Sequence, residues 1–153
     1  MSLPVSRWLI TAFLLFVIPA EGADKITALF AGYNPKRAAE IAEIVKDTAD
    51  GYGINPGLIA AIIVNESGVR PEVVSKGGDY GLMQVRWKVH RRTYPELKNS
   101  PSPLFDAETN IRIGTDIFVR YYKQKKTIRG ALLKYSGGSR KYAEKVIKIF
   151  ESL

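Results

Sequence analysis

Apolar residues recur at helical spacing along the first half of the chain. Two helices are predicted to begin at Asn34-Pro35 and at Asn55-Pro56, because an asparagine cap followed by proline favours a first helical turn. The first runs to Tyr52 and the second to about Ser67, and a glycine follows each. The first helix carries five small or apolar residues on one face: Ala38, Ile41, Ala42, Val45 and Ala49.

Three more helices are predicted in the second half of the chain. Each follows a residue whose side chain can accept a hydrogen bond from the first turn, and these caps are Asp106, Thr127 and Ser139. The predicted helices cover residues 107–125, 128–135 and 140–150.

Glycine and proline interrupt the chain between these two groups of helices. Residues 69–80 and 89–104 are predicted to be irregular, and residues 81–88 are compatible with a short helix. No segment alternates apolar and polar residues convincingly. The sequence therefore predicts one all-α domain with little or no sheet, and 153 residues suffice for a modest single core.

The first 22 residues have the three-part layout of a secretory signal peptide. One positive charge at Arg7 precedes an uncharged apolar run from Trp8 to Ile18, and small residues follow. We expect cleavage after about Ala20 or Gly22, which leaves residues 23–153 as the mature domain. The run is shorter than the roughly 20 residues of a membrane span. No stable span is therefore expected after cleavage, and an uncleaved anchor is the alternative.

Composition narrows the possible chemistry and the possible partners. The formal charge of +8 implies affinity for polyanions, and export favours an anionic cell wall over nucleic acid. The chain has no cysteine and a single histidine, His90, which excludes thiolate zinc sites, cysteine nucleophiles and multi-histidine metal sites. His90 is expected to be an exposed loop residue in a solvated basic patch with Lys88, Arg91 and Arg92.

Glu66 occupies a position that the helical pattern assigns to the buried face. Ile59, Ile62 and Ile63 lie at positions i, i+3 and i+4 of an apolar stripe, and Glu66 lies at i+7. Burial and the nearby helix C-terminus both raise the pKa of a carboxyl group. A carboxyl group that is protonated near neutral pH suits general-acid cleavage of a glycosidic bond. The pattern by itself also fits a carboxylate that emerges into solvent.

Four short motifs follow one another along the chain: Glu66-Ser67, Gly81-Leu82-Met83-Gln84, Asn110 with Gly114, and Tyr135-Ser136-Gly137-Gly138. Taken in this order, they resemble the lytic transglycosylase domain of the soluble-transglycosylase type, a relative of goose-type lysozyme. The resemblance runs from about Ala38 to Tyr142. It implies a lysozyme-like helical domain and a peptidoglycan lytic transglycosylase.

The resemblance implies a role for each motif residue near the cleft. Glu66 matches the catalytic glutamate, and Ser67 matches a neighbour that helps to orient the carboxyl group or the substrate. The second motif would line the sugar cleft and bind substrate. There Gly81 would allow close backbone approach, Met83 would give a sugar face an apolar floor, and Gln84 would offer a donor and an acceptor. Leu82 belongs to the same lining, although Leu82 and Met83 are also ordinary core residue types.

The third and fourth motifs are expected behind the cleft and beside the glutamate. Asn110 and Gly114 match a structural motif that packs behind the cleft. Tyr135 matches a tyrosine that contributes to substrate binding and whose hydroxyl points toward the catalytic glutamate. Lys134 and Ser136 depart from the alanine and asparagine usual beside that tyrosine, which puts the hydrogen bond of the asparagine in doubt.

The implied reaction uses one carboxyl group in two roles. Glu66 would protonate the bond between N-acetylmuramic acid (MurNAc) and N-acetylglucosamine (GlcNAc), and would then accept the proton of the muramic 6-hydroxyl. The product would be a 1,6-anhydro-MurNAc end, with no metal and no organic cofactor. A glycosidase with two carboxylates would need a second acid. The candidates Glu72 and Asp79 match no catalytic residue of the family.

Peptidoglycan glycan strands are the implied partner, and the implied setting is the periplasm. Asp79-Tyr80 before the second motif is similar to the small transglycosylases of secretion and conjugation machines, so such an apparatus is a further candidate partner. A monomer is expected. A hydrolytic lysozyme on the same fold, a non-catalytic wall-binding accessory of a secretion system and a basic membrane-active protein are the alternatives.

Overall fold

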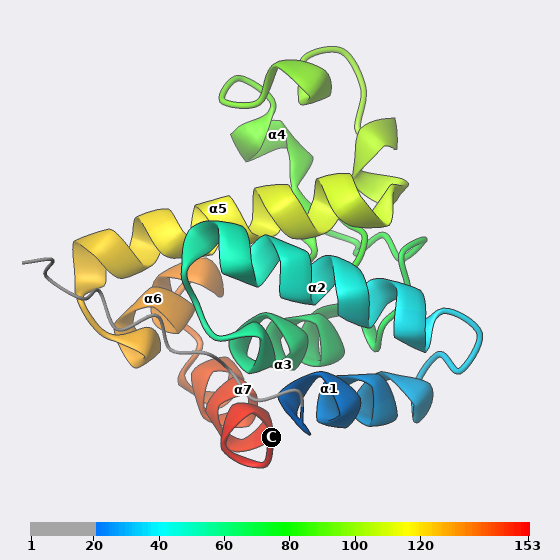
Figure 1. Ribbon diagram of the computed structural model, residues 1–153. Coiled ribbons are helices and arrows are strands. Elements are labelled where there is room, and N and C mark those ends of the chain that lie inside the picture. The colour runs from blue at the N-terminus through cyan, green and yellow to red at the C-terminus, as the bar shows by residue number, and fades with distance from the viewer. Residues whose placement is uncertain (1–20) are drawn as a thin grey trace, which may run out of the picture.

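The computed structural model describes residues 21–153 (Figure 1). The expected signal peptide lies, up to residue 20, outside the described residues. Helices make up most of the described part, and its sheet has two strands of two residues each, so the predicted all-α fold with little or no sheet is confirmed. The elements are α1 Glu21–Ala31, α2 Ala38–Tyr52, α3 Pro56–Ser67, β1 Asp79–Tyr80, β2 Val85–Arg86, α4 Trp87–His90, the 3-10 helices η1 Pro95–Leu97 and η2 Ser102–Phe105, α5 Ala107–Lys125, α6 Ile128–Tyr135 and α7 Arg140–Glu151.

The predicted starts of α3, α5, α6 and α7 are confirmed by their caps. The side chain of Asn55 accepts a hydrogen bond from the backbone N–H two residues later, at 2.8 Å. The side chains of Asp106, Thr127 and Ser139 each accept one from the N–H three residues later. These bonds satisfy donors that the first turn of a helix leaves free.

The predicted start of α2 at Asn34 is wrong by one turn. The helix begins at Ala38, and its N-cap residue Arg37 makes no capping hydrogen bond with its side chain. The side-chain amide of Asn34 instead donates to the carbonyl oxygen of Val69 at 2.9 Å. A contact 35 residues away in sequence has therefore replaced the expected local cap.

Residues 81–88 were compatible with a short helix, but most of them form a turn and strand β2. Helix α4 begins only at Trp87. Strands β1 and β2 pair antiparallel, with Asp79 opposite Arg86 and Tyr80 opposite Val85. Gly81 and Gln84 between them have positive φ angles of 74° and 48°. Both angles lie outside the right-handed helical region, which explains why the segment turns back as a hairpin.

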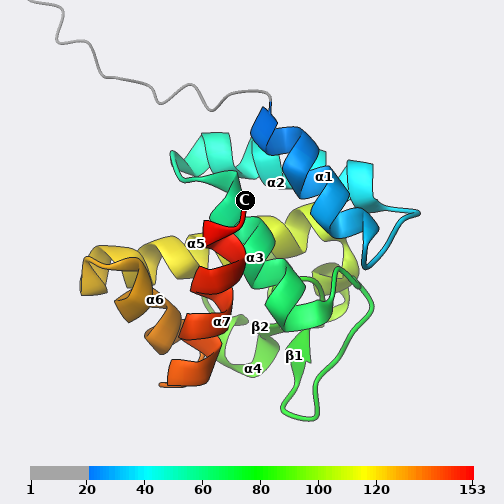
Figure 2. The same cartoon turned by 90° about the horizontal axis from the view of Figure 1, so that it is seen from below.

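Helix α3 forms the centre of the molecule. It packs against α7, α2 and α1, and both cartoon views show it enclosed by these helices (Figures 1 and 2). Every residue from Pro56 to Val64 is buried, so the helix is apolar on all sides until its last turn. That last turn carries Glu66, which the fold therefore holds on a rigid and central element.

A smaller apolar cluster joins the hairpin, the two 3-10 helices and one face of α5. Its buried members are Val85, Tyr94, Leu97, Leu104, Ile113 and Ile117. The cluster fixes the hairpin and α4 against α5, opposite the end of α3. Between residues 21 and 153, no helix is long and apolar enough to cross a membrane.

Candidate active site

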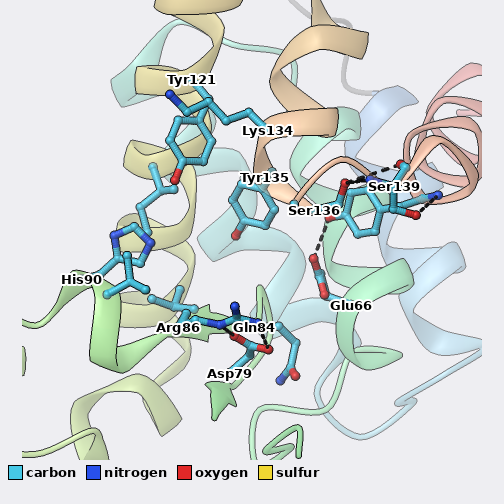
Figure 3. Close-up of a pocket in the computed structure, with 15 residues that line it drawn as sticks. Glu66, Asp79, Gln84, Arg86, His90, Tyr121, Lys134, Tyr135, Ser136 and Ser139 are labelled. Atoms are coloured by element: carbon cyan, nitrogen blue, oxygen red, sulfur yellow. Dashed lines mark hydrogen bonds and ion pairs between the residues drawn. The ribbon is translucent and has the colours of Figure 1, made fainter. Parts of the chain in front are cut away.

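A cleft of about 380 Å³ opens where the end of α3 meets the hairpin, α4, α5, α6 and α7. In the view of Figure 3, Glu66 lies on one side and His90 on the other, while Asp79, Gln84 and Arg86 form the lower edge. Residues far apart in the sequence thus contribute to one concave site of the size that binds small ligands.

Glu66 is half-buried in this cleft and is hydrogen-bonded to a tyrosine. The hydroxyl of Tyr142 donates to Glu66 Oε1 at 2.6 Å. Burial raises the pKa of Glu66 to about 7, the hydrogen bond from Tyr142 acts in the opposite direction, and the charge of Asp79 raises the pKa further. A carboxyl group with this pKa can both give and take a proton near neutral pH.

The end of α3 is fixed by Ser67 and Gly68. Ser67 is buried, and its hydroxyl donates to the carbonyl oxygen of Ile63 at 3.1 Å. Gly68 has a φ of 58° and ends the helix in the left-handed conformation. Ser67 therefore fixes the helix end that carries Glu66, and it has almost no surface for substrate.

The residues of the second motif lie mostly beneath the cleft. Leu82 and Met83 are fully buried, so the expectation that they line the cleft and bind a sugar is corrected. Met83 packs against Gly114, where an added Cβ would lie 2.7 Å from Met83 Cβ and Sδ. Gly81 allows a close approach, as expected, but to the protein itself: an added Cβ would lie 2.3 Å from Asn110 Nδ2 and from the Leu104 carbonyl oxygen.

The side chain of Asn110, on helix α5, connects this segment by hydrogen bonds. Its side-chain oxygen accepts from the N–H of Met83, and its amide nitrogen donates to the carbonyl oxygens of Tyr80 and Leu104, each at 2.8 Å. The side chain is completely buried, so these three bonds replace the water that it would otherwise bind. Asn110 therefore determines the path of the hairpin.

Gln84 is the member of the second motif whose side chain reaches the cleft. Its amide nitrogen donates to the carbonyl oxygens of Val73 at 3.1 Å and Gly81 at 2.9 Å. Both N–H groups of the Gln84 amide are used in these bonds, so its oxygen alone is left for a ligand. Gln84 can therefore act as an acceptor, whereas a donor and an acceptor were expected.

Tyr135 was expected to point its hydroxyl toward Glu66, but two tyrosines, Tyr135 and Tyr142, lie at this side of the cleft. The hydroxyl of Tyr135 donates to the carbonyl oxygen of Met83 at 2.8 Å, and the tyrosine bonded to Glu66 is Tyr142. Sequence reasoning gave Tyr142 no role. A signal was present: Tyr142 lies at i, i+4 spacing with buried Val146 on α7, and a buried tyrosine hydroxyl needs a partner.

Asp79 is the second carboxylate of the cleft. It accepts hydrogen bonds from Ser75 Oγ at 2.8 Å and from Arg86 Nε at 2.7 Å. Burial raises the pKa of Asp79, but the hydrogen bonds from Arg86 and Ser75 outweigh it and hold the pKa below its ordinary value. Asp79 is therefore ionised at neutral pH. The other candidate, Glu72, is exposed and does not line the cleft.

His90 and Lys134 also reach the cleft, and the expectation of an exposed loop histidine is wrong. His90 ends α4 and is half-buried, and burial together with the charges of Arg120 and Arg86 lowers its pKa. Lys134 is exposed, and its ammonium group lies 4.9 Å from the centre of the Tyr121 ring. No set of three acidic or histidine side chains within residues 21–153 is arranged to hold a metal ion.

Comparison with known proteins finds relatives of this chain among murein transglycosylases. The model of the family described as the transglycosylase SLT domain matches residues 43–149. The endo-type membrane-bound lytic murein transglycosylase A of Klebsiella pneumoniae subsp. pneumoniae is 37% identical over 117 residues, which are 71% of this chain and 56% of the relative. The membrane-bound lytic murein transglycosylase C of Yersinia pestis is 35% identical over 130 residues, covering 76% of this chain and 35% of the relative.

The chain spans about half, or less, of the length of these relatives. The matched segment nevertheless includes the helix that carries Glu66, the hairpin, and the two helices that carry Tyr135 and Tyr142. The chain belongs to the transglycosylase SLT domain family.

Proposed function

We propose that the chain is a peptidoglycan lytic transglycosylase, which cleaves the bond between MurNAc and GlcNAc and leaves 1,6-anhydro-MurNAc ends. One observation carries the proposal: Glu66 lies in the cleft with a pKa raised to about 7 and with a hydroxyl group hydrogen-bonded to it. A lone carboxyl group that serves first as an acid and then as a base needs a pKa close to the working pH.

The proposed reaction begins when protonated Glu66 gives its proton to the glycosidic oxygen. The bond from that oxygen to the muramic C1 breaks, and the oxygen of the substrate's own acetamido group bonds to C1. The hydrogen bond from Tyr142 then stabilises the ionised Glu66. Glu66 takes the proton of the muramic 6-hydroxyl as that oxygen bonds to C1 and displaces the acetamido oxygen. No water is consumed, and Glu66 ends protonated as it began.

Product analysis tests this proposal. The wild-type chain should release anhydro-ended fragments from purified peptidoglycan, identified by mass spectrometry. Glu66→Gln keeps the side chain's shape but cannot donate the proton, so turnover should fall by at least about a hundredfold. A fully active Glu66→Gln variant would refute the assignment of the site. Sedimentation of the wild type with the wall, without any turnover, would support a non-catalytic wall-binding protein instead.

Hydrolysis is the second candidate function, and Asp79 favours it. This ionised carboxylate lines the same cleft as Glu66 and is held by Arg86 and Ser75. A second carboxylate in the cleft can act as a base toward a water molecule that attacks C1, as in glycosidases that use two acids. Digestion in water labelled with oxygen-18 separates the two reactions: hydrolysis places the label in a new reducing end, and the transglycosylase reaction incorporates none.

We propose that the chain acts on the wall outside the cytoplasm, in the periplasm. The apolar run near its start supports export, and the two relatives compared above are named membrane-bound murein transglycosylases. Fractionation of cells that express the tagged chain tests this location. Recruitment by a secretion or conjugation apparatus and the monomeric state stay predictions.

A further inference from the structure

The positive charge of the chain is concentrated in its last 35 residues. Residues 119–153 contain ten Lys and Arg and two Glu residues, a formal charge of +8, whereas residues 21–118 contain twelve basic and thirteen acidic residues, a formal charge of −1. Residues 119–153 form the end of α5 and all of α6 and α7, and both views show these segments together on one side (Figures 1 and 2). The charge is therefore concentrated on one group of neighbouring helices.

The exposed basic side chains of these helices are named the basic face, and there are ten of them: Arg120, Lys123, Lys125, Lys126, Arg129, Lys134, Arg140, Lys141, Lys145 and Lys148. Within the described residues, two of them form ion pairs, Arg120 with Asp116 at 2.8 Å and Arg129 with Glu144 at 3.8 Å. The other eight have no acidic partner in that part of the chain. Unpaired like charges on one surface repel one another and attract a polyanion.

The basic face begins at the rim of the cleft. Lys134 lines the cleft, and so does Ser139, which directly precedes Arg140 and Lys141. Helix α7 contributes to both the cleft and the basic face, because Tyr142 bonds to Glu66 from the same turn that carries Lys141. A polymer whose backbone occupies the cleft would therefore bring its side groups onto this face.

Helix α7 presents its lysines as a stripe. Lys141, Lys145 and Lys148 follow one another at i, i+4 and i+7, which places them on one side of the helix. Ala143 and Val146 occupy the opposite, buried side. Lysine carries a compact charge on a flexible stem, so such a stripe suits carboxylates whose positions vary from one repeat to the next.

We propose that the basic face binds the acidic peptide substituents of the wall polymer whose glycan occupies the cleft. The inference rests on the proposed function, because peptidoglycan is the polymer that carries such peptides. An anionic membrane is the competing polyanion. The continuity of the face with the cleft favours the peptides, since they are attached to the same strand.

Sedimentation with purified wall sacculi tests the proposal, in a Glu66→Gln background that prevents digestion. One variant carries Lys141→Gln, Lys145→Gln and Lys148→Gln. Its control carries Lys36→Gln, Lys46→Gln and Lys98→Gln, an equal loss of charge among exposed residues outside the basic face. Matching thermal midpoints show that both variants fold. If the first fails to fold, Lys123→Gln, Lys125→Gln and Lys126→Gln at the end of α5 replace it.

The α7 variant should bind peptide-bearing sacculi about tenfold more weakly than its parent, since each exposed charge pair contributes little by itself. The control should stay close to the parent. Neither should differ from it on glycan stripped of peptides by an amidase, or at about 1 M salt, where charges are screened within about 3 Å. Equal weakening by both variants, or weakening on stripped glycan, would overturn the proposal.

Two further results separate this proposal from its rivals. The α7 variant could lose binding to phosphatidylglycerol vesicles and still bind sacculi as its parent does. That result would assign the basic face to a membrane and overturn the peptide proposal. Wild-type chain that releases no anhydro-ended product would refute the proposed function. Peptide-dependent binding in that same preparation would still support the basic face, so the two proposals fail separately.

Discussion

The floor and the wall of the cleft are built from different kinds of residues. The cleft floor consists of Gly81, Leu82, Met83, Asn110 and Gly114, which are all buried. Asn110 contacts Gly81 and Met83, and Met83 packs against Gly114. These residues carry much of the family resemblance, yet they present almost no surface to a ligand. Their function is to give the hairpin its shape.

The cleft wall is formed by Tyr135 and Tyr142, which line the cleft together with Glu66. Its two hydroxyl groups hold different atoms, since Tyr142 bonds to the carboxyl group and Tyr135 to the carbonyl oxygen of Met83. The wall therefore adjusts the chemistry of Glu66 and also anchors the floor. The most recognisable residues of a motif can therefore be structural, while a less recognisable one contacts the carboxyl group of Glu66. Substitutions in the floor should change stability, and those around Glu66 should change its protonation.

Gly81→Ala should have the largest effect and should act on stability. The added Cβ would lie 2.3 Å from two atoms, one of them backbone, at a φ of 74°. Steric overlap and backbone strain together should lower the free energy of unfolding by about 3–5 kcal/mol, measured by urea denaturation. Gly78→Ala is the matched control, because Gly78 has a φ of 79° and no atom within 4 Å of the added Cβ. Its cost should be the strain of about 1–2 kcal/mol, and equal losses would contradict the packing argument.

Glu66→Gln should change how stability depends on pH. The pKa of Glu66 is raised from 4.5 to about 7 by burial, so the folded state binds the proton more tightly than the unfolded state. That contribution is complete below pH 4.5 and is lost as the pH rises through about 7. Glutamine cannot ionise, so the variant should gain on the wild type by up to ~3 kcal/mol between about pH 5 and pH 9. A difference in unfolding free energy that does not vary with pH would contradict the raised pKa.

Local features made much of the fold predictable from sequence. The starts of α3, α5, α6 and α7 follow from side chains that bond within two or three residues, and these predictions are confirmed. The hairpin was not predicted, because its path depends on Asn110, which bonds to Tyr80 and Met83 about 30 residues away. The start of α2 was misplaced for the same reason, since Asn34 bonds to Val69.

The candidate site was predictable to a similar degree. Glu66 was singled out because an acidic residue interrupts an apolar stripe, which is a local pattern, and the ordered motifs that follow it made it the candidate acid. Its surroundings depend on how α7 docks against α3, and the bond from Tyr142 spans 76 residues. Asp79 reaches the cleft only because the hairpin folds back and pairs it with Arg86. Such relations arise from packing, and no local spacing encodes them.

Tyr142→Phe should produce a smaller effect that distinguishes the two tyrosines of the wall. The hydroxyl of Tyr142 stabilises the ionised form of Glu66 and thereby lowers its pKa. Without it the pKa of Glu66 should rise further. Because the proposed reaction starts from protonated Glu66, the decline of kcat/KM with increasing pH should move to higher pH. A pH–rate profile on soluble glycan fragments measures this shift.

Two controls show whether the shift is specific to the hydrogen bond from Tyr142. Asp79→Asn removes a charge that raises the pKa of Glu66, so its profile should move in the opposite direction, to lower pH. Tyr135→Phe should leave the profile in place and cost about 1 kcal/mol of stability, because it removes the bond to the Met83 carbonyl oxygen. If Tyr135→Phe moved the profile and Tyr142→Phe did not, Tyr135 would be the partner of Glu66 in solution. The distinction between a wall residue that anchors the floor and one that adjusts the acid would then be reversed.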